Sequence, residues 1–164
     1  MARLLDALDR LLRATIGAGQ WLVLPVLVLL FAQWPLRDIF RAYSREANDL
    51  GQIFFALYVA IALSAATRAG THLAADALAR SYPARVRILL VRLGALLGLL
   101  PWALFILIAG RRIVLWSVEQ QELFPDTFNP GYFLIKVAMA LLALLVILQA
   151  IIDIARPKIP GGHP

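Results

Sequence analysis

Cysteine is absent from the 164 residues, and the chain contains only two histidines, His72 and His163. Without cysteine the chain can form no disulfide, no thiolate nucleophile and no thiolate metal site. Axial ligation of haem inside a helical bundle needs paired histidines, or a histidine and a methionine, on facing helices. Neither histidine lies in an apolar stretch. We therefore expect no cofactor, no metal centre and no enzymatic activity.

Charged residues are also scarce, at 16% of the chain against 62% hydrophobic residues, whereas about a quarter of a soluble domain is charged. A spanning helix needs about 20 mostly apolar residues. Four stretches approach that length, at about residues 14–34, 50–67, 93–110 and 132–152, and the second and third contain no charged residue. The sequence predicts an all-α integral membrane protein, a single membrane domain over residues 1–164 with four transmembrane helices.

The N-terminal residues 1–13 are amphipathic, with leucines on one helical face and charged side chains on the other. Asp6 and Arg10, like Asp9 and Arg13, have the i,i+4 spacing of helical ion pairs. Such a helix lies in the plane of the lipid headgroups. A signal peptide is the rival interpretation, but its apolar region would be about 7–15 residues long. We therefore expect an interfacial helix followed by a membrane span.

Basic residues predict the orientation of the spans. Ten arginines and lysines lie in the N-terminal segment, the second connection and the tail, against five in the first and third connections. Cytoplasmic segments carry the excess of basic residues, so both termini are expected in the cytoplasm. The formal charge of +6 then indicates contact with anionic membrane lipids, not with nucleic acid.

The second connection is expected to contain a short amphipathic helix on the membrane surface. His72, Asp76 and Arg80 share one face of this segment at i,i+4 steps, which indicates structural contacts at the interface. Arg85 lies shortly before the third span and is expected to reach the cytoplasmic headgroups.

Three polar positions near the spans leave questions open. Lys136, early in the fourth span, either pairs with an outer-loop acid or reaches the interface, or it contacts a substrate. Arg111 and Arg112 either mark the end of the third helix, or the helix continues and Trp116 lies at the interface. Asp49 and Gln52 have the spacing of a cap pair that opens the second helix.

Three segments resemble the small, DctQ-like membrane subunit of tripartite ATP-independent periplasmic (TRAP) transporters. They are residues 48–52, residues 65–76 with small residues before a His-hydrophobic-x-x-Asp pattern, and the acidic outer loop followed by residues 130–149. The resemblance extends from about Asp38 to Ile154. One departure is Ala75, where that family often has a branched residue.

The resemblance implies a non-catalytic subunit in a bacterial inner membrane. Its partners would be a large membrane subunit, which holds the substrate and sodium sites, and a periplasmic substrate-binding protein, which delivers an organic acid. The small subunit would enlarge the scaffold and offer part of the docking face. The candidate docking residues in the outer loops are Arg37, Arg41, Arg45, Glu119, Glu122, Phe124, Asp126 and Phe128. The alternative is a stand-alone four-helix membrane protein, such as a small exporter or an assembly factor.

Overall fold

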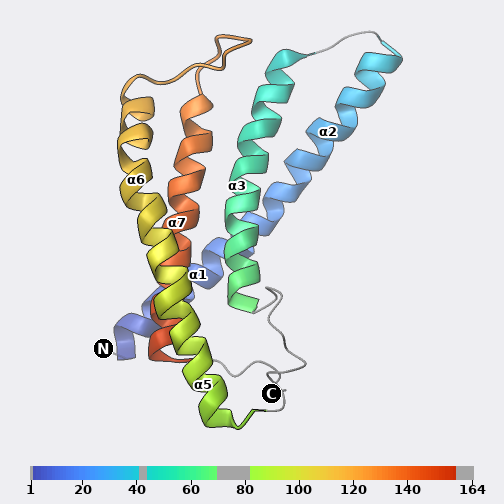
Figure 1. Cartoon of the computed structure of the whole chain (residues 1–164). Coiled ribbons are helices and arrows are strands. Elements are labelled where there is room, and N and C mark those ends of the chain that lie inside the picture. The colour runs from blue at the N-terminus through green and yellow to red at the C-terminus, as the bar shows by residue number, and fades with distance from the viewer. Residues whose placement is uncertain (1, 41–43, 70–81, 158–164) are drawn as a thin grey trace.

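The computed structural model describes residues 2–40, 44–69 and 82–157 (Figure 1). The described residues form helices and no strand. Four helical stretches are long and apolar enough to cross a membrane: Arg3–Pro35, Arg45–Ala69, Ala84–Glu119 and Tyr132–Ala155. This confirms the predicted all-α fold class with four spans. Each stretch extends beyond its predicted apolar core into flanking polar residues.

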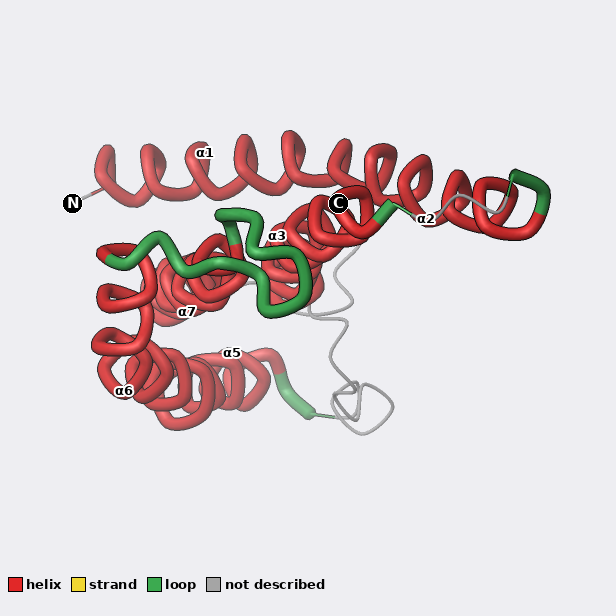
Figure 2. The backbone as a smooth tube through the Cα atoms, turned by 90° about the horizontal axis from the view of Figure 1, so that it is seen from above, coloured by secondary structure: helices red, strands yellow, loops and turns green. Residues whose placement is uncertain are grey.

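The first stretch is interrupted, so that its two halves run in different directions. Helix α1 (Ala2–Gly19) is followed by the 3-10 turn η1 (Gln20–Leu22) and by α2 (Val23–Asp38). Pro25 lies in the first turn of α2 and removes one backbone donor from the helical ladder, which favours a break at this point. Seen along the bundle, α1 appears at full length, whereas α3, α6 and α7 are foreshortened (Figure 2). Helix α1 therefore lies across the end of the bundle, and it extends past the predicted end at residue 13.

Helix α3 (Arg45–Ala69) begins four residues before the predicted cap at Asp49. The Ala47 backbone N–H donates a hydrogen bond of 3.1 Å to the Ser44 hydroxyl oxygen, which is the side-chain contact of a helix cap. The prediction that Asp49 caps this helix is wrong. Asp49 lies inside the helix and is only 6% exposed. Its carboxylate accepts hydrogen bonds from the loop of residues 120–131.

The third stretch is one long helix with a wider segment in its middle. It consists of α5 (Ala84–Leu93), the π-helix η2 (Gly94–Leu99) and α6 (Leu100–Glu119). The Leu100 N–H donates to the Ala95 carbonyl, five residues back, immediately before Pro101. A proline has no N–H and interrupts the regular ladder, and single π turns are common where a helix must absorb such a defect. The helix continues past Arg111 and Arg112 to Glu119, so the arginine pair does not mark its end.

Helix α7 (Tyr132–Ala155) lies between its main neighbours α3 and α6 (Figure 1). Its alanines Ala138, Ala143 and Ala150 are buried, and small residues allow helices to approach closely in lipid. The hydrophobic core lies near the crosswise helix and contains Leu12 of α1, Ile61 of α3, and Leu145 and Ile152 of α7. Helix α2 lies outside this core and packs mainly along α3.

Two ends of the bundle are named by what they contain. The α1 end contains α1, the C-terminal turns of α3 and α7, and α5 (Figure 1). The loop end contains the N-terminal turns of α3 and the loop of residues 120–131, which joins α6 to α7. Asp6 of α1 forms an ion pair with Arg156 after α7. The two ends of the described chain therefore meet at the α1 end, and its cytoplasmic location stays a prediction.

Candidate interaction surfaces

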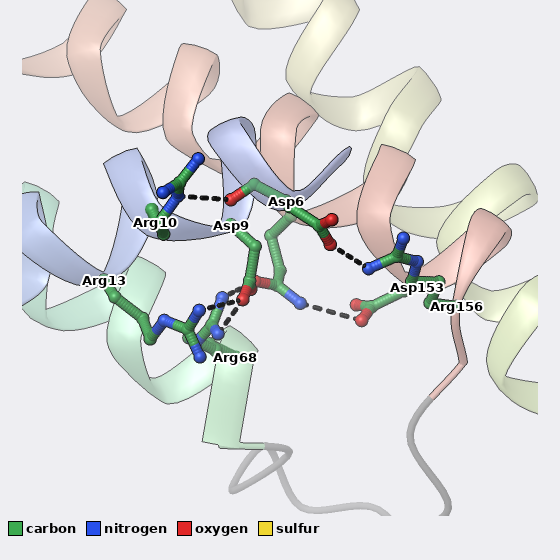
Figure 3. A network of polar contacts seen from close by, with 8 residues as sticks. Asp6, Asp9, Arg10, Arg13, Arg68, Asp153 and Arg156 are labelled. Carbon is green, nitrogen blue, oxygen red and sulfur yellow. Dashed lines mark hydrogen bonds and ion pairs between the residues drawn. The ribbon is translucent and has the colours of Figure 1, made fainter. Parts of the chain in front are cut away.

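A partly buried arginine connects three helices at the α1 end (Figure 3). Arg68, in the last turn of α3, donates to the Asp9 carboxylate of α1 at 2.6 Å and to the Gln149 side-chain oxygen of α7 at 3.3 Å. The Gln149 amide nitrogen in turn donates to Asp153 at 2.7 Å. Arg13 forms a second ion pair with Asp9 at 2.7 Å, which confirms the predicted i,i+4 contact. We call these five residues the Arg68 network.

Burial makes the Arg68 network a structural element of the bundle. The Arg68 and Asp9 side chains are 13% and 21% exposed, and Gln149 is 1% exposed. Polar groups at such sites are costly unless they are bonded, and Arg68 bonds to two other helices at once. The network therefore fixes α1 against α3 and α7. The sequence did not predict that Arg68 connects three helices, because an arginine at the end of an apolar stretch is typical of an ordinary residue at the membrane interface.

The other predicted N-terminal pair is arranged differently. Arg10 donates to the backbone oxygen of Asp6 at 3.3 Å, and the Asp6 carboxylate pairs with Arg156. Asp6 therefore adds a second connection between α1 and the end of α7.

At the loop end, Lys136 of α7 forms an ion pair with Glu122 of the loop of residues 120–131. The Ser117 hydroxyl of α6 donates to the same carboxylate. The hydrogen bonds from Lys136 and then Ser117 lower the pKa of Glu122 below the ordinary value for a glutamate. The Lys136 ammonium also lies 5.4 Å from the centre of the Tyr132 ring. Lys136 therefore pairs with a loop acid, which is the first of its two sequence interpretations.

Phe124 is one of the candidate docking residues, and direct docking would require an exposed ring, but Phe124 is only 3% exposed. Its ring meets Tyr132 edge to face, with centroids 5.4 Å apart and an interplanar angle of 77°. The Phe124 N–H donates to the Asn129 carbonyl, and the Phe128 N–H donates to the Phe124 carbonyl, at 2.8 and 2.9 Å. These bonds fold the loop over the Phe124 ring. Phe128, with a positive φ of 58°, is 75% exposed.

The same loop is bonded to α3 through Asp49. The Thr127 hydroxyl donates to the Asp49 carboxylate at 2.5 Å, and the Asn129 side-chain amide donates to the same oxygen at 3.3 Å. Beside these bonds lies a polar hollow of about 280 Å³, lined by Arg45, Asn48, Asp49, Asp126 and Thr127. The hollow brings the predicted docking residues Arg45 and Asp126 together from two distant segments.

The remaining predicted residues are dispersed. Arg37 at the end of α2 is paired with its neighbour Asp38 at 2.8 Å, and Glu119 is exposed at the end of α6. Arg85 is exposed on α5 at the opposite end. Arg41, His72, Asp76 and Arg80 lie outside the described residues, so the predicted helix around His72 stays a prediction.

The described residues combine small hollows with long exposed apolar sides. No group of three histidine, aspartate or glutamate residues that could hold a metal ion is present in residues 2–40, 44–69 and 82–157. Hollows between the helices hold about 210 to 280 Å³, whereas ligand pockets commonly hold about 300–1,000 Å³. Five ion pairs are formed by the described residues, on α1, at the end of α2 and at the two ends of the bundle, while long apolar sides stay exposed.

Comparison with known proteins gives one match. Residues 26–157 match the family model described as tripartite ATP-independent periplasmic transporters, DctQ component. No curated protein and no solved structure matches the chain. The match covers most of the chain, from the first turn of α2 to beyond the end of α7, and it confirms the resemblance drawn from the three sequence segments.

Proposed function

Since the chain belongs to the DctQ family of TRAP transporter components, we propose that it is the non-catalytic small subunit that scaffolds the large membrane subunit. In this proposal it also helps to dock the periplasmic binding protein for sodium-coupled uptake of an organic acid. The complex lies in a bacterial inner membrane, with both termini of this chain in the cytoplasm. Membership of this family makes the chain a component of a transporter. The structure adds four helices that are able to span a membrane.

The exposed apolar sides of the helices are the observation that carries the scaffold role. Large hydrophobic side chains are left uncovered along the spans, among them Leu27 at 56%, Leu30 at 56%, Phe31 at 74% and Phe55 at 53%. A chain of this size, built from four long apolar helices, presents mainly lateral surface. Such a surface suits packing against a larger membrane protein, with lipid covering the rest.

Docking of the binding protein is assigned to the loop end. Its exposed groups carry both signs, with Arg45 beside Asp126 and with Glu119 nearby in the chain. Complementary charges of this kind mainly set the encounter rate and the register of transient partners. Phe128 offers an exposed aromatic anchor. Phe124 and Glu122 contribute indirectly, because they hold the loop in shape.

Affinity purification of the tagged chain after co-expression with the large subunit tests the scaffold role. We expect the two subunits to purify together, and uptake to require both of them. A chain that folds and purifies without the large subunit, while uptake by the large subunit proceeds unchanged, would support the stand-alone alternative.

The docking role is tested by charge reversal, with Glu119→Lys combined with Asp126→Lys. Uptake should slow at limiting binding protein and recover when the binding protein is raised, since rim charges act on association. The matched control neutralises the same positions with Glu119→Gln and Asp126→Asn, and its effect should be smaller. Added salt should reduce the difference, because exposed charges are screened beyond about 8–10 Å. Normal uptake by the reversed variant at limiting binding protein contradicts docking at this loop.

A further inference from the structure

A groove between α2 and α3 opens toward the loop end, where the two helices diverge (Figure 1). It holds about 210 Å³ and is lined by Leu30, Gln33, Asn48, Gly51, Gln52 and Phe55. We call it the α2–α3 groove. It shares Asn48 with the polar hollow beside Asp126, and most of its exposed lining is apolar.

Three amide side chains line this groove, and all three are at least partly exposed. Within the described part of the chain, neither Gln33 nor Asn48 nor Gln52 has a hydrogen-bond partner for its side chain. Each side-chain amide has two N–H donors and one carbonyl acceptor. Acyl chains have no group that can pair with them. Side-chain amides that face a second helix, by contrast, commonly bond across the contact in membranes.

Gly51 leaves room in the same groove for a close approach. A Cβ atom added at Gly51 would meet nothing within 4 Å, so the α3 backbone at this point faces open space. Small residues at such positions let the backbones of two membrane helices come together. Leu30 and Phe55 supply apolar contact area on the two walls.

Helix α2 also lacks support on this side. Its main neighbour is α3, and outward-facing residues such as Leu27 and Phe31 are 56% and 74% exposed. A tilted helix that contacts one neighbour over part of its length gains most from a further helix placed in the opening. That helix would bury the apolar walls and satisfy the amides in one step.

We propose that a transmembrane helix of the large membrane subunit occupies the α2–α3 groove. It packs its small or narrow face against Gly51 and forms hydrogen bonds with Gln33, Asn48 and Gln52. This inference rests on the proposed function, because it identifies the surface through which the scaffold contact is made. A lipid acyl chain and a second copy of this chain are the competing occupants.

Photo-cross-linking tests the occupant directly. Because the native chain has no cysteine, Leu30→Cys and Phe55→Cys each introduce a single thiol that can carry a benzophenone maleimide. The controls are Leu97→Cys and Phe105→Cys, whose positions are exposed on η2 and α6. In the assembled complex we expect protein adducts with the large subunit from the two groove positions, and lipid adducts from the controls. Adducts only with lipid, or only with a second copy of the chain, at the groove positions overturn the inference.

A second test fills the groove. Gly51 is buried, but a Cβ atom at this position meets nothing within 4 Å, so Gly51→Leu directs its longer side chain into the groove. Unfolding of the isolated variant in detergent checks that it still folds. The substitution should lower the recovery of the large subunit by about tenfold, the ratio that corresponds to about 1.4 kcal/mol. Gly98→Leu is the matched control, since Gly98 is exposed and also has nothing within 4 Å of an added Cβ.

Failure of the proposed function and failure of the groove contact would give different results. If the native chain does not co-purify with the large subunit, the proposed function itself is wrong. If co-purification succeeds, but Gly51→Leu has no effect and cross-links form only at Leu97 or Phe105, the scaffold role stands and the groove is not its contact surface.

Discussion

The contact between Gly19 and Ile61 provides a sharp test of how α1 is attached to the bundle. Gly19, the last residue of α1, is buried, and a Cβ atom built on it would lie 2.4 Å from Ile61 Cγ2 and 3.0 Å from Ile61 Cβ. The φ of Gly19 is −66°, which any residue adopts. Gly19→Ala therefore introduces a steric conflict without backbone strain. The Ile61 Cβ atom cannot rotate away, so α1 or α3 must shift.

The expected magnitude follows from two opposing effects. Overpacking of a tight contact costs about 1–3 kcal/mol, while replacing glycine by alanine in a helix gains up to about 1 kcal/mol. Gly17→Ala is the matched control in the same helix, because a Cβ there meets nothing within 4 Å. Both variants receive the gain from alanine, so the Gly19 variant should be less stable than the Gly17 variant by the overpacking cost, about 1–3 kcal/mol.

Unfolding in detergent, followed by tryptophan fluorescence, measures this difference. The double-mutant cycle with Ile61→Ala isolates the contact, because the Cγ2 and Cδ1 atoms that conflict with the new methyl group are then absent. In that background Gly19→Ala should cost much less, which appears as a coupling energy between the two positions. If Gly19→Ala is as stable as Gly17→Ala, the close packing of α1 on α3 is refuted.

Three further predictions concern the two ends of the bundle. Arg68→Leu removes the side chain that joins Asp9 of α1 to α3 and α7, and it should destabilise the subunit by about 2 kcal/mol, between the values for exposed and fully buried pairs. Arg13→Leu should cost under about 1 kcal/mol as a largely exposed pair. Equal losses in detergent unfolding would contradict the bridging role of Arg68. Because the folded-state pKa of Glu122 is depressed, its contribution to stability is present above the ordinary pKa of a glutamate and is lost as the pH falls through the folded value. Melting temperatures measured across acidic pH should therefore fall less steeply for Glu122→Gln than for the native chain, and parallel curves would contradict the assignment. Reporter fusions after Asp126 and at the C-terminus should report the periplasm and the cytoplasm, respectively, and the opposite result would reverse the predicted topology.

The positions of the spans could be predicted from the sequence because crossing a bilayer depends mainly on the length of an apolar run. The internal geometry of the runs was less accessible. A proline indicates that a helix will be disturbed, but the neighbouring helices decide how. Near Pro25 the chain changes direction through η1, whereas near Pro101 it absorbs the defect in a π-helix and continues through Arg111 and Arg112.

The candidate interaction surfaces were predicted only in part, because pairing depends on which distant segments meet. Lys136 could be assigned to a loop acid from its depth and charge, but nothing local identifies Glu122 as the acid. Asp49 has the spacing of a cap and is instead bonded by Thr127, 78 residues away. Phe124 and Phe128 look alike in the sequence, and only the backbone bonds of the loop separate the buried ring from the exposed one.

The bonds that hold α1 also set an order of events during synthesis. Arg68, the partner of Asp9, is synthesised 59 residues after it. Arg156, the partner of Asp6, is synthesised 150 residues after Asp6. At a synthesis rate of roughly 5–20 residues per second, the N-terminal helix waits on the order of ten seconds for its last contact. Until Arg68 is made, Asp9 has Arg13 of the same helix beside it, together with lipid headgroups and water. A chain that stalls before the end of α7 would therefore lack the contact between Asp6 and Arg156, and its N-terminal helix could be attached to α3 but not to the end of α7.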